Sequence, residues 1–336
     1  MNILYFTRNA TTHPAFHPLF EQAVRQVADL TIVRNGEALP VPQQLDIIRQ
    51  YDVMLLMRDT VSLPPELART PGRLRYVCCA FGSLAGVVGP EIIDSPILVT
   101  NYGDAAAQGL AEGALALLLA TLKDLRHRIA VIKRGGFGVD PVTHGGWVEG
   151  LNVGVYGCGA IGRRFLELLR PFRATVRVFD PYLTECPPGV TRVSSLEELF
   201  ANSQAIVIHA GLSAETRGSV TAALLAKLPR HGVVINTARG AIIDQTALFA
   251  ELASGRLRAG LDVLDPEELP AGHPARHWEN CLITGHQIHQ GWPTPPDAVP
   301  TRLDAVDEIC LENLRRWRDG QPLRGRITPT ILRRMT

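Results

Sequence analysis

The sequence predicts an α/β protein built from two doubly wound parallel-sheet domains. Three observations lead to this expectation. Short apolar runs alternate with helix-like amphipathic stretches along most of the chain, a rhythm typical of βαβ units. The chain has 336 residues, more than one ordinary hydrophobic core needs, so two domains are expected. The rhythm also restarts after a glycine-rich stretch at residues 135–147, which should be a loop that leads into a new unit.

The first hundred residues contain four candidate strands separated by helical patterns. Each is a short apolar run, and they cover residues 2–6, 30–33, 53–57 and 75–79. A long helix is expected at residues 105–122, where alanine and leucine make it apolar round much of its circumference. Such a helix is usually buried, so we expect it at a domain or subunit interface, and we expect a homodimer.

Six further candidate strands follow in the second half of the chain. They cover residues 152–156, 175–179, 205–209, 232–236, 258–262 and 281–284, and helical segments separate most of them. Six strands with helical crossovers are enough for a complete doubly wound sheet. A proline-rich stretch at residues 293–300 then precedes a helix at residues 302–317, which we expect to return to the N-terminal domain.

Composition argues against several classes of protein. The 34 basic and 33 acidic residues nearly cancel and no basic run stands out, so we expect no nucleic-acid partner. No apolar stretch reaches the roughly 18 residues that a membrane span needs, so we expect no membrane partner. The chain starts directly in an apolar run without a basic leader, which predicts a cytoplasmic protein. Its six cysteines form no CxxC pair and no zinc spacing, so reduced thiols are expected.

A glycine-rich turn joins the candidate strand 152–156 to a helix at residues 163–169. The turn reads GCGAIG, and each glycine has a physical task. Gly157 permits a tight turn, Gly159 lets the backbone approach a pyrophosphate, and Gly162 lets the helix pack closely on the strand. The helix N-terminus offers free N–H groups to a diphosphate. The pattern therefore predicts a dinucleotide site, whereas a plain strand-to-helix turn or a methyltransferase loop leaves the later motifs unexplained.

An aspartate at the end of the next strand completes this fingerprint. Asp180 lies 18 residues beyond Gly162, where a carboxylate can accept a hydrogen bond from the ribose 2′-hydroxyl. The same charge repels the additional phosphate of NADP, and the next residues, Pro181 and Tyr182, include no arginine to bind that phosphate. The sequence therefore favours NAD as the cofactor.

Three later motifs occur in a fixed order after the glycine-rich turn. They read NTARG at residues 236–240, GLDVLDPE at 260–267 and LITGH at 282–286. Together these motifs resemble those of the D-isomer-specific 2-hydroxyacid dehydrogenases, whose members carry Asn-x-x-Arg-Gly, Asp-Val-x-x-x-Glu and a late Pro-His. The resemblance covers nearly the whole chain. Gly285 stands where the family usually has proline, and Gln287, Ile288 and His289 replace the usual small residues.

The resemblance implies a domain plan and an activity. We expect a Rossmann NAD-binding domain at residues 104–284, inserted in a flavodoxin-like substrate domain formed by residues 1–103 and 285–336. The expected activity is hydride transfer between NAD(H) and a small 2-hydroxy or 2-oxo acid of the D series. A regulator that has the same fold and binds NAD without turnover is the alternative.

The resemblance also assigns roles to individual residues. Arg239 is expected to bind the substrate, since a guanidinium fork matches a carboxylate beside a carbonyl. His286 is the expected acid-base group, because histidine titrates near neutrality. Glu267 should orient that histidine, and Asp262 should contact the nicotinamide carboxamide.

The remaining site residues are predicted as contacts of cofactor or substrate. The expected cofactor contacts are Gly157, Gly159, Ala160, Ile161, Gly162, Asp180, Thr237 and Asp262. Backbone N–H groups of Gly82 and Ser83 should bind the substrate carboxylate together with Arg239. We expect no metal, because His286 and His289 lack a third ligand at a recognisable spacing. His209 and Cys158 are interpreted as strand-end and turn residues.

Overall fold

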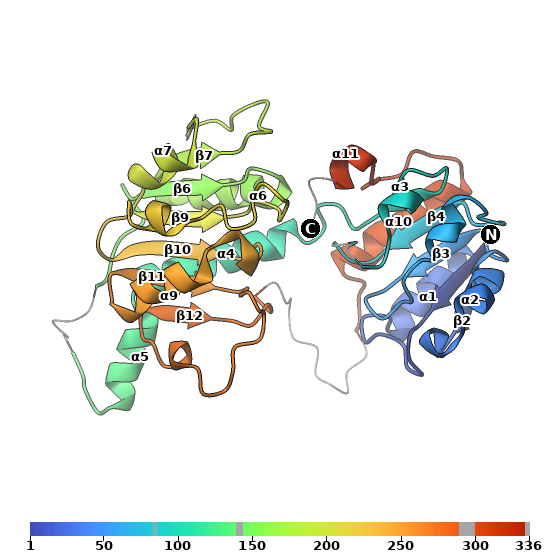
Figure 1. The fold of residues 1–336 in the computed structure, drawn as a ribbon, viewed down its shortest axis with the longest axis horizontal. Helices are drawn as coiled ribbons and strands as arrows, with labels where there is room; N and C mark the ends of the chain where they lie inside the picture. The colour runs from blue at the N-terminus through green and yellow to red at the C-terminus, as the bar shows by residue number, and fades with distance from the viewer. Residues whose placement is uncertain (83, 85, 139–143, 289–299, 333–336) are drawn as a thin grey trace. The chain divides into compact units, whose positions relative to one another are not determined.

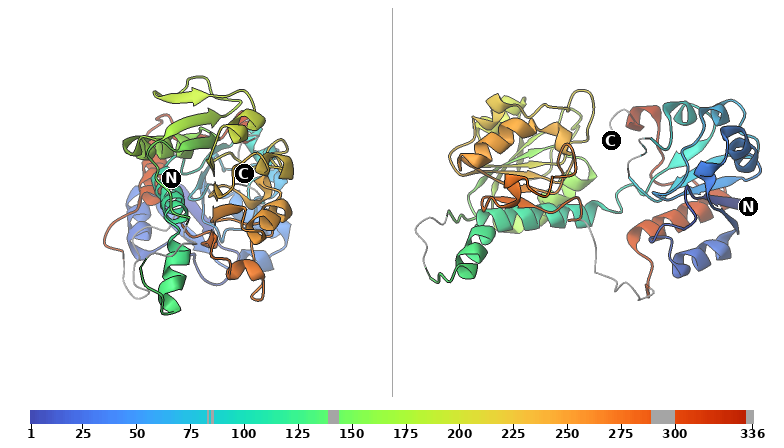
Figure 2. Two further views of the ribbon diagram at one scale, coloured as in Figure 1. Left: turned by 90° about the vertical axis from the view of Figure 1, so that its left-hand side faces the viewer. Right: turned by 60° about the horizontal axis from the view of Figure 1, so that its bottom comes forward.

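The chain forms two compact units, which we describe one at a time (Figures 1 and 2). The computed structural model describes every residue except 83, 85, 139–143, 289–299 and 333–336. The first unit combines residues 1–106 with 292–336, and the second comprises residues 107–291. The predicted proline-rich stretch at residues 293–300 falls almost wholly outside the described residues.

The first unit contains a five-stranded sheet in the order β2-β1-β3-β4-β5, in which all neighbours are parallel. Its strands are β1 (Asn2–Phe6), β2 (Asp29–Val33), β3 (Val53–Leu56), β4 (Tyr76–Cys79) and β5 (Leu98–Thr100). This strand order is that of flavodoxin-like folds. The four predicted strands are confirmed. The fifth has only three residues, too few to show a periodic pattern.

Helices cover both faces of this sheet. They are α1 (Pro18–Val27), α2 (Val41–Ile48), α3 (Pro90–Ile93), α10 (Ala305–Arg318) and α11 (Pro329–Leu332), with 3-10 turns η1 (Gly36–Ala38) and η2 (Pro65–Ala68). Helix α10 comes from the C-terminal part of the chain and packs against α1 and β4. Its Asp307 accepts a hydrogen bond from Nε2 of His17, over 3.0 Å, at the start of α1. This contact joins the two chain segments that form the unit.

The second unit contains a seven-stranded parallel sheet in the order β12-β11-β10-β9-β6-β7-β8. Its strands are β6 (Asn152–Tyr156), β7 (Thr175–Phe179), β8 (Val190–Arg192), β9 (Ala205–Ile208), β10 (Gly232–Asn236), β11 (Leu257–Leu261) and β12 (Cys281–Ile283). The order reverses between β6 and β9, as in a Rossmann fold. All six predicted strands are present, so the predicted fold class is confirmed. The additional strand β8 has one apolar residue in three and gave no signal.

The helices of the second unit are α4 (Ala107–Leu122), α5 (Leu125–Lys133), α6 (Ala160–Leu169), α7 (Leu196–Ala201), α8 (Ala222–Leu225) and α9 (Gln245–Ala253). Short 3-10 turns are η3 (Arg170–Phe172), η4 (Gly240–Ile242) and η5 (Pro274–Arg276). Helix α4 packs against α6, β10 and β11. Its own unit buries one side of the helix, and the predicted domain or subunit interface stays a prediction. Helix α5, which the sequence analysis missed, has no buried residue.

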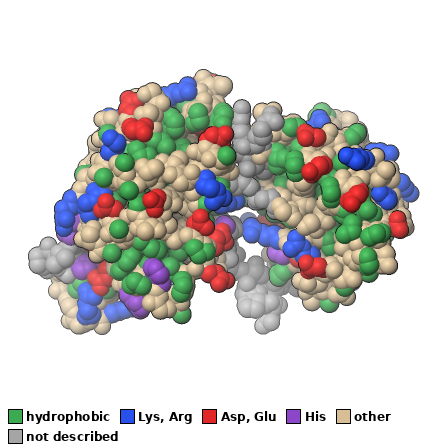
Figure 3. Space-filling model, viewed as in Figure 1, with side chains coloured by type: hydrophobic (Ala, Val, Ile, Leu, Met, Phe, Trp, Pro, Cys, Tyr) green, Lys and Arg blue, Asp and Glu red, His purple; other side chains and the backbone are tan. Residues whose placement is uncertain are grey.

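Two further features are the distribution of charged side chains on the surface and the apolar character of the helices. Acidic and basic side chains are interspersed on the face shown in Figure 3. Within the described part of the chain, none of the helices combines the length and the apolar character needed to cross a lipid bilayer.

Candidate active site

The glycine-rich turn has the geometry of a dinucleotide loop. Gly157 has a φ of +93°, and a Cβ there would lie 2.5 Å from the backbone nitrogen of Ala210. A Cβ at Gly162 would lie 2.3 Å from the carbonyl oxygen of Gly157, so close packing of α6 on the turn needs glycine. A Cβ at Gly159 would meet nothing within 4 Å, so there is open space beside the loop. Helix α6 begins at Ala160 without a side-chain cap, which leaves its first N–H groups for a ligand.

Asp180 follows β7 and is held directly against this loop. Its Oδ2 accepts a hydrogen bond from the backbone N–H of Cys158 over 2.7 Å, and its Oδ1 accepts one from the N–H of Tyr182 over 2.8 Å. A carboxylate has about four acceptor positions, so both oxygens retain capacity for ribose hydroxyls. The residues present therefore fit a dinucleotide with an unphosphorylated ribose.

His209 lies beneath the glycine-rich turn at the end of β9. Its ring centroid lies 5.1 Å from that of Phe165 on α6, and its Nε2 is buried without a hydrogen-bond partner. Burial lowers the pKa of His209 to about 3, so its ring is neutral. A permanently neutral imidazole cannot serve as an acid at ordinary pH, which agrees with the structural interpretation of this residue.

The NTARG motif forms a compact turn after β10. Asn236 accepts a hydrogen bond from the N–H of Ala238 over 3.0 Å and donates one to the carbonyl oxygen of Arg239 over 2.9 Å. A Cβ at Gly240 would lie 2.0 Å from the carbonyl carbon of Leu264, so only glycine permits this approach. The half-buried Arg239 is thereby fixed at the end of the strand. Thr237 is buried, and its hydroxyl has no hydrogen-bond partner.

Asp262 is the most buried acidic residue of the site, with 1% of its surface exposed. Its Oδ1 accepts three hydrogen bonds, from the Thr284 hydroxyl over 2.6 Å, the Gln287 N–H over 2.9 Å and the Ile288 N–H over 3.1 Å. Its Oδ2 is buried and has no partner. An unsatisfied buried carboxylate oxygen is unusual and leaves an acceptor for a ligand's N–H group, as a carboxamide would supply.

His286 and Glu267 form a hydrogen-bonded pair. Nδ1 of His286 lies 3.0 Å from Oε1 of Glu267. Because an ionised carboxylate only accepts hydrogen bonds, Nδ1 must carry the proton of this bond. The side chains are 34% and 61% exposed, so the pair is open to solvent and to small molecules.

Most of the predicted site residues gather at one edge of the seven-stranded sheet. Arg239, Asp262 and His286 follow the neighbouring strands β10, β11 and β12, and Glu267 follows Asp262. The glycine-rich turn and Asp180 follow β6 and β7 at the same carboxyl edge, where ligands bind in doubly wound folds.

The predicted substrate loop belongs to the first unit. Gly82 follows β4, and its carbonyl oxygen accepts a hydrogen bond from the side chain of Asn101 over 3.1 Å. A Cβ at this position would lie 2.4 Å from the hydroxyl of Tyr102. Ser83 lies outside the described residues, so its predicted contact stays a prediction.

Sequence reasoning missed the residues that surround Asp262. Thr284, Gln287 and Ile288 bind its carboxylate, two of them through backbone N–H groups that carry no signal in a sequence. His289, the partner considered for a metal site, is not among the described residues; within those residues, no cluster of three or more His, Cys, Asp and Glu side chains could hold a metal ion.

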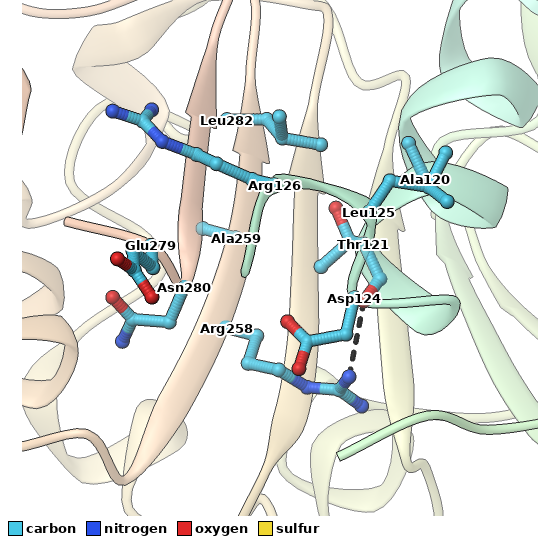
Figure 4. Close-up of a pocket in the computed structure, with 10 residues that line it drawn as sticks. All are labelled: Ala120, Thr121, Asp124, Leu125, Arg126, Arg258, Ala259, Glu279, Asn280 and Leu282. Atoms are coloured by element: carbon cyan, nitrogen blue, oxygen red, sulfur yellow. Dashed lines mark hydrogen bonds between the residues drawn. The ribbon is translucent and has the colours of Figure 1, made fainter. Parts of the chain in front are cut away.

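A small pocket beside α4, drawn in Figure 4, has a structural function. Its volume is about 10 Å³, roughly enough for one water molecule. Nη1 of Arg258 donates hydrogen bonds to the carbonyl oxygens of Thr121, over 3.0 Å, and His144, over 2.6 Å. Arg258 thus satisfies a carbonyl at the C-terminal end of α4, and the buried Asp124 lies nearby.

Comparison with known proteins identifies related sequences. Residues 115–287 match the model of the D-isomer specific 2-hydroxyacid dehydrogenase, NAD binding domain. The human glyoxylate reductase/hydroxypyruvate reductase is 33% identical over 273 residues, which are 79% of this chain and 83% of the human protein. The D-3-phosphoglycerate dehydrogenase of Methanocaldococcus jannaschii is 27% identical over 274 residues, which are 80% of this chain but 52% of that protein. The chain thus spans about half the length of that relative.

Solved structures show the same fold. An acyclic imino acid reductase in complex with NADPH and D-Arg aligns with a TM-score of 0.77 at 22% identity, over 97% of this chain and 100% of that one. The NAD complex of a D-isomer specific 2-hydroxyacid dehydrogenase from Lactobacillus delbrueckii ssp. bulgaricus also reaches 0.77, at 18% identity, over 98% of this chain and 100% of that one.

The motifs, the sheet order and the sequence matches agree with one another. The match to the family model covers about half of the chain, and the human relative extends the similarity into both units. The predicted resemblance is therefore confirmed, and the cofactor of the second unit is a nicotinamide dinucleotide. The chain belongs to the D-isomer specific 2-hydroxyacid dehydrogenase family.

Proposed function

We propose that this protein catalyses the NAD(H)-dependent interconversion of a small 2-oxo acid and the corresponding D-2-hydroxy acid. The observation that carries the proposal is the hydrogen bond between His286 and Glu267, on the sheet edge where Arg239 also lies. A histidine held by a carboxylate on one ring nitrogen can exchange a proton with a substrate oxygen through the other. A regulator without turnover has no need of such a pair.

Each residue has one task in this reaction. Arg239 binds the carboxylate and carbonyl oxygens of the 2-oxo acid through its guanidinium fork. Residues 157–162 and Asp180 would hold the dinucleotide, which would supply the hydride that the carbonyl carbon accepts. His286 donates a proton from Nε2 to the carbonyl oxygen as negative charge develops there. Glu267 accepts the Nδ1 hydrogen bond and stabilises the charged ring. In the direction of oxidation, the neutral ring of His286 accepts the proton of the hydroxyl group.

The named relatives indicate which acids to test first. The human and Thermotoga maritima relatives are a glyoxylate reductase/hydroxypyruvate reductase and a hydroxypyruvate reductase. We therefore propose glyoxylate and hydroxypyruvate as the first substrates. The test follows NADH absorbance with a panel of 2-oxo acids, and adds D-3-phosphoglycerate with NAD. Turnover of any acid supports the enzyme, whereas NADH binding without turnover of any acid supports the regulator.

The cofactor preference gives a direct prediction. Asp180 should favour NADH over NADPH, because its carboxylate accepts a ribose hydroxyl and repels a 2′-phosphate. Asp180→Ala should weaken NADH binding by about tenfold, since it removes roughly one charge-assisted hydrogen bond, and it should weaken NADPH less. Dissociation constants measured by fluorescence titration check this. Tighter binding of NADPH than NADH by the unmodified protein would contradict the assignment.

We also propose that the protein is a cytoplasmic homodimer. All six cysteines are free thiols, which is what a reducing compartment such as the cytoplasm maintains.

Helix α5 exposes three aliphatic residues on one face, Leu125, Ile129 and Ile132, with 44%, 54% and 56% of their surfaces accessible. The opposite side of the helix is fixed to its own unit by the His127–Glu279 contact. Because dimers usually pair identical patches about a twofold axis, this face suits a second copy of the chain.

This assembly has a clear test. Ile129→Glu combined with Ile132→Glu should convert the dimer into a monomer, because burying two carboxylates in an apolar interface is strongly unfavourable. Sedimentation velocity at micromolar concentration measures the change. Val41→Glu, at a similarly exposed position of the first unit, serves as the control. The proposal fails if the unmodified protein is monomeric, or if the double variant stays dimeric.

A further inference from the structure

The loop that carries His286 has an unusual backbone. Gly285 and His286 both lie in the left-handed region, with φ values of +66° and +61°. Residues other than glycine adopt this conformation rarely, and Asn and His are among the side chains that tolerate it best. Proline is confined to a φ near −65°. The proline that family members usually carry before this histidine is therefore incompatible with the backbone of this chain.

The loop is instead anchored by hydrogen bonds to the carboxylate of Asp262. The Thr284 hydroxyl and the N–H groups of Gln287 and Ile288 all donate to its Oδ1, so residues on both sides of His286 bind one atom. The N–H of His286 donates to the backbone carbonyl oxygen of Asp262 over 2.5 Å. Asp262 itself is buried at the end of β11, and its N–H donates to the carbonyl oxygen of Asn236. The anchor is therefore rigid.

Packing fixes the far end of the same loop. The side chain of Ile288 lies over Gly113 of α4, where an added Cβ would lie 2.8 Å from its Cγ1. Ile288 also contacts the apolar cluster between α4 and the sheet. The histidine thus lies between two fixed points, the bond from Thr284 to Asp262 and the contact of Ile288 with α4.

We propose that Asp262, Thr284 and Gly285 form a positioning group that replaces the family proline and holds the ring of His286 against Glu267. Thr284 acts on His286 through its hydroxyl bond to Asp262 and Gly285 acts through the backbone of the loop, so both are positioning residues. The inference rests on the proposed function in one respect, namely that His286 moves the proton. It adds that the proton transfer depends on the loop around His286, which has a left-handed backbone at residues 285 and 286 and is hydrogen-bonded to Asp262.

The first test is a series at Gly285. A Cβ at this position meets nothing within 4 Å, so substitutions act through φ and not through size. We expect kcat for the best 2-oxo acid to fall in the order Gly, Asn, Ala, Pro. Gly285→Asn should stay within about threefold, Gly285→Ala should lose up to about tenfold, and Gly285→Pro should lose at least about a hundredfold. The affinity for NADH should change by less than about twofold.

A matched control separates loop position from general strain. Gly255, after α9, has a φ of +71° and also has nothing within 4 Å of an added Cβ. Gly255→Asn and Gly255→Ala should leave kcat unchanged while they lower the melting temperature as much as the same changes at Gly285. Equal losses of kcat at the two positions would overturn the proposal. So would a Gly285→Pro enzyme that retains activity.

The second test concerns the anchor itself. Thr284→Val keeps the shape of the side chain but removes its donor to Asp262, and Thr284→Ser restores the donor. We expect kcat to fall about tenfold in the valine variant, as the loss of roughly one hydrogen bond to a carboxylate predicts, and to recover in the serine variant. Thr191→Val, on the exposed strand β8, is the control. Activity of Thr284→Val equal to that of the unmodified protein would overturn the proposal.

A spectroscopic measurement distinguishes failure of this proposal from failure of the proposed function. The ring signals of His286 are assigned by their absence in His286→Ala, and their chemical shifts are compared at one pH. Gly285→Pro should move them to the position found in Glu267→Ala, because both changes break the same hydrogen bond. This result supports the positioning group even if no 2-oxo acid is turned over. Unmoved signals in Gly285→Pro would overturn it even in an active enzyme.

Discussion

Replacing His286 by alanine is expected to lower kcat for reduction of the 2-oxo acid by about 10² to 10⁴, the usual contribution of a positioned acid-base group. Hydride transfer places negative charge on the carbonyl oxygen, and without the imidazole only water can give that oxygen its proton. The affinity for NADH should stay near that of the unmodified protein, because the nucleotide is held by residues 157–162 and Asp180. Steady-state kinetics and a fluorescence titration measure the two effects separately.

The protonation state that each reaction needs at His286 sets the direction in which its rate changes with pH. Reduction consumes the proton of the charged ring, so its rate should decline on the alkaline side. Oxidation of the hydroxy acid needs the neutral ring, so its rate should rise over the same interval. His286→Ala should abolish both dependences. If the profiles survive this change, another group moves the proton. His209 is a poor candidate, because burial lowers its pKa to about 3.

The features that sequence could predict are those that depend on residue type. Each glycine of the turn at residues 157–162 was interpreted through a specific steric task, and two of these tasks are visible as backbone approaches below 3 Å. The strands of both sheets other than β5 and β8 were predicted because buried parallel strands are continuous apolar runs. Asp180, Arg239, Glu267 and His286 were predicted through motif order, and the structure brings the last two within hydrogen-bond distance.

The features that sequence could not predict depend on backbone groups or on very short elements. Strands β5 and β8 have three residues each and show no periodicity. Helix α5 has no buried residue, and the sequence analysis missed it although Leu125, Ile129 and Ile132 follow helical spacing. The role of Asp262 as a loop anchor depends mainly on N–H groups of Gln287 and Ile288. Gly285 was noted only because family members usually have proline at that position. Its structural role became clear only from the positive φ angles of Gly285 and His286.

The second large loss of activity is expected when Arg239 is replaced. We expect Arg239→Lys to lose nearly as much kcat/KM as Arg239→Ala, at least about a hundredfold, although lysine keeps the positive charge. The reason is geometric, because a guanidinium fork offers two parallel N–H groups to a carboxylate and a carbonyl oxygen, and an ammonium group is a single point donor. Lysine would lose the hydrogen bond that Nη1 of Arg239 donates to the carbonyl oxygen of Ala238 over 2.7 Å, but the two bonds of Asn236 that shape the turn would remain.

The measurement for Arg239 is kcat/KM for both directions of the reaction, with the affinity for NADH as the control for correct folding. Arg217 lies on the surface with its side chain 62% exposed, and Arg217→Lys should leave the kinetics unchanged. A lysine variant at position 239 that keeps most of kcat/KM would show that charge alone suffices and that the fork is not used. A loss confined to KM would indicate that Arg239 binds the carboxylate equally in the ground state and the transition state, and leaves the carbonyl oxygen to His286.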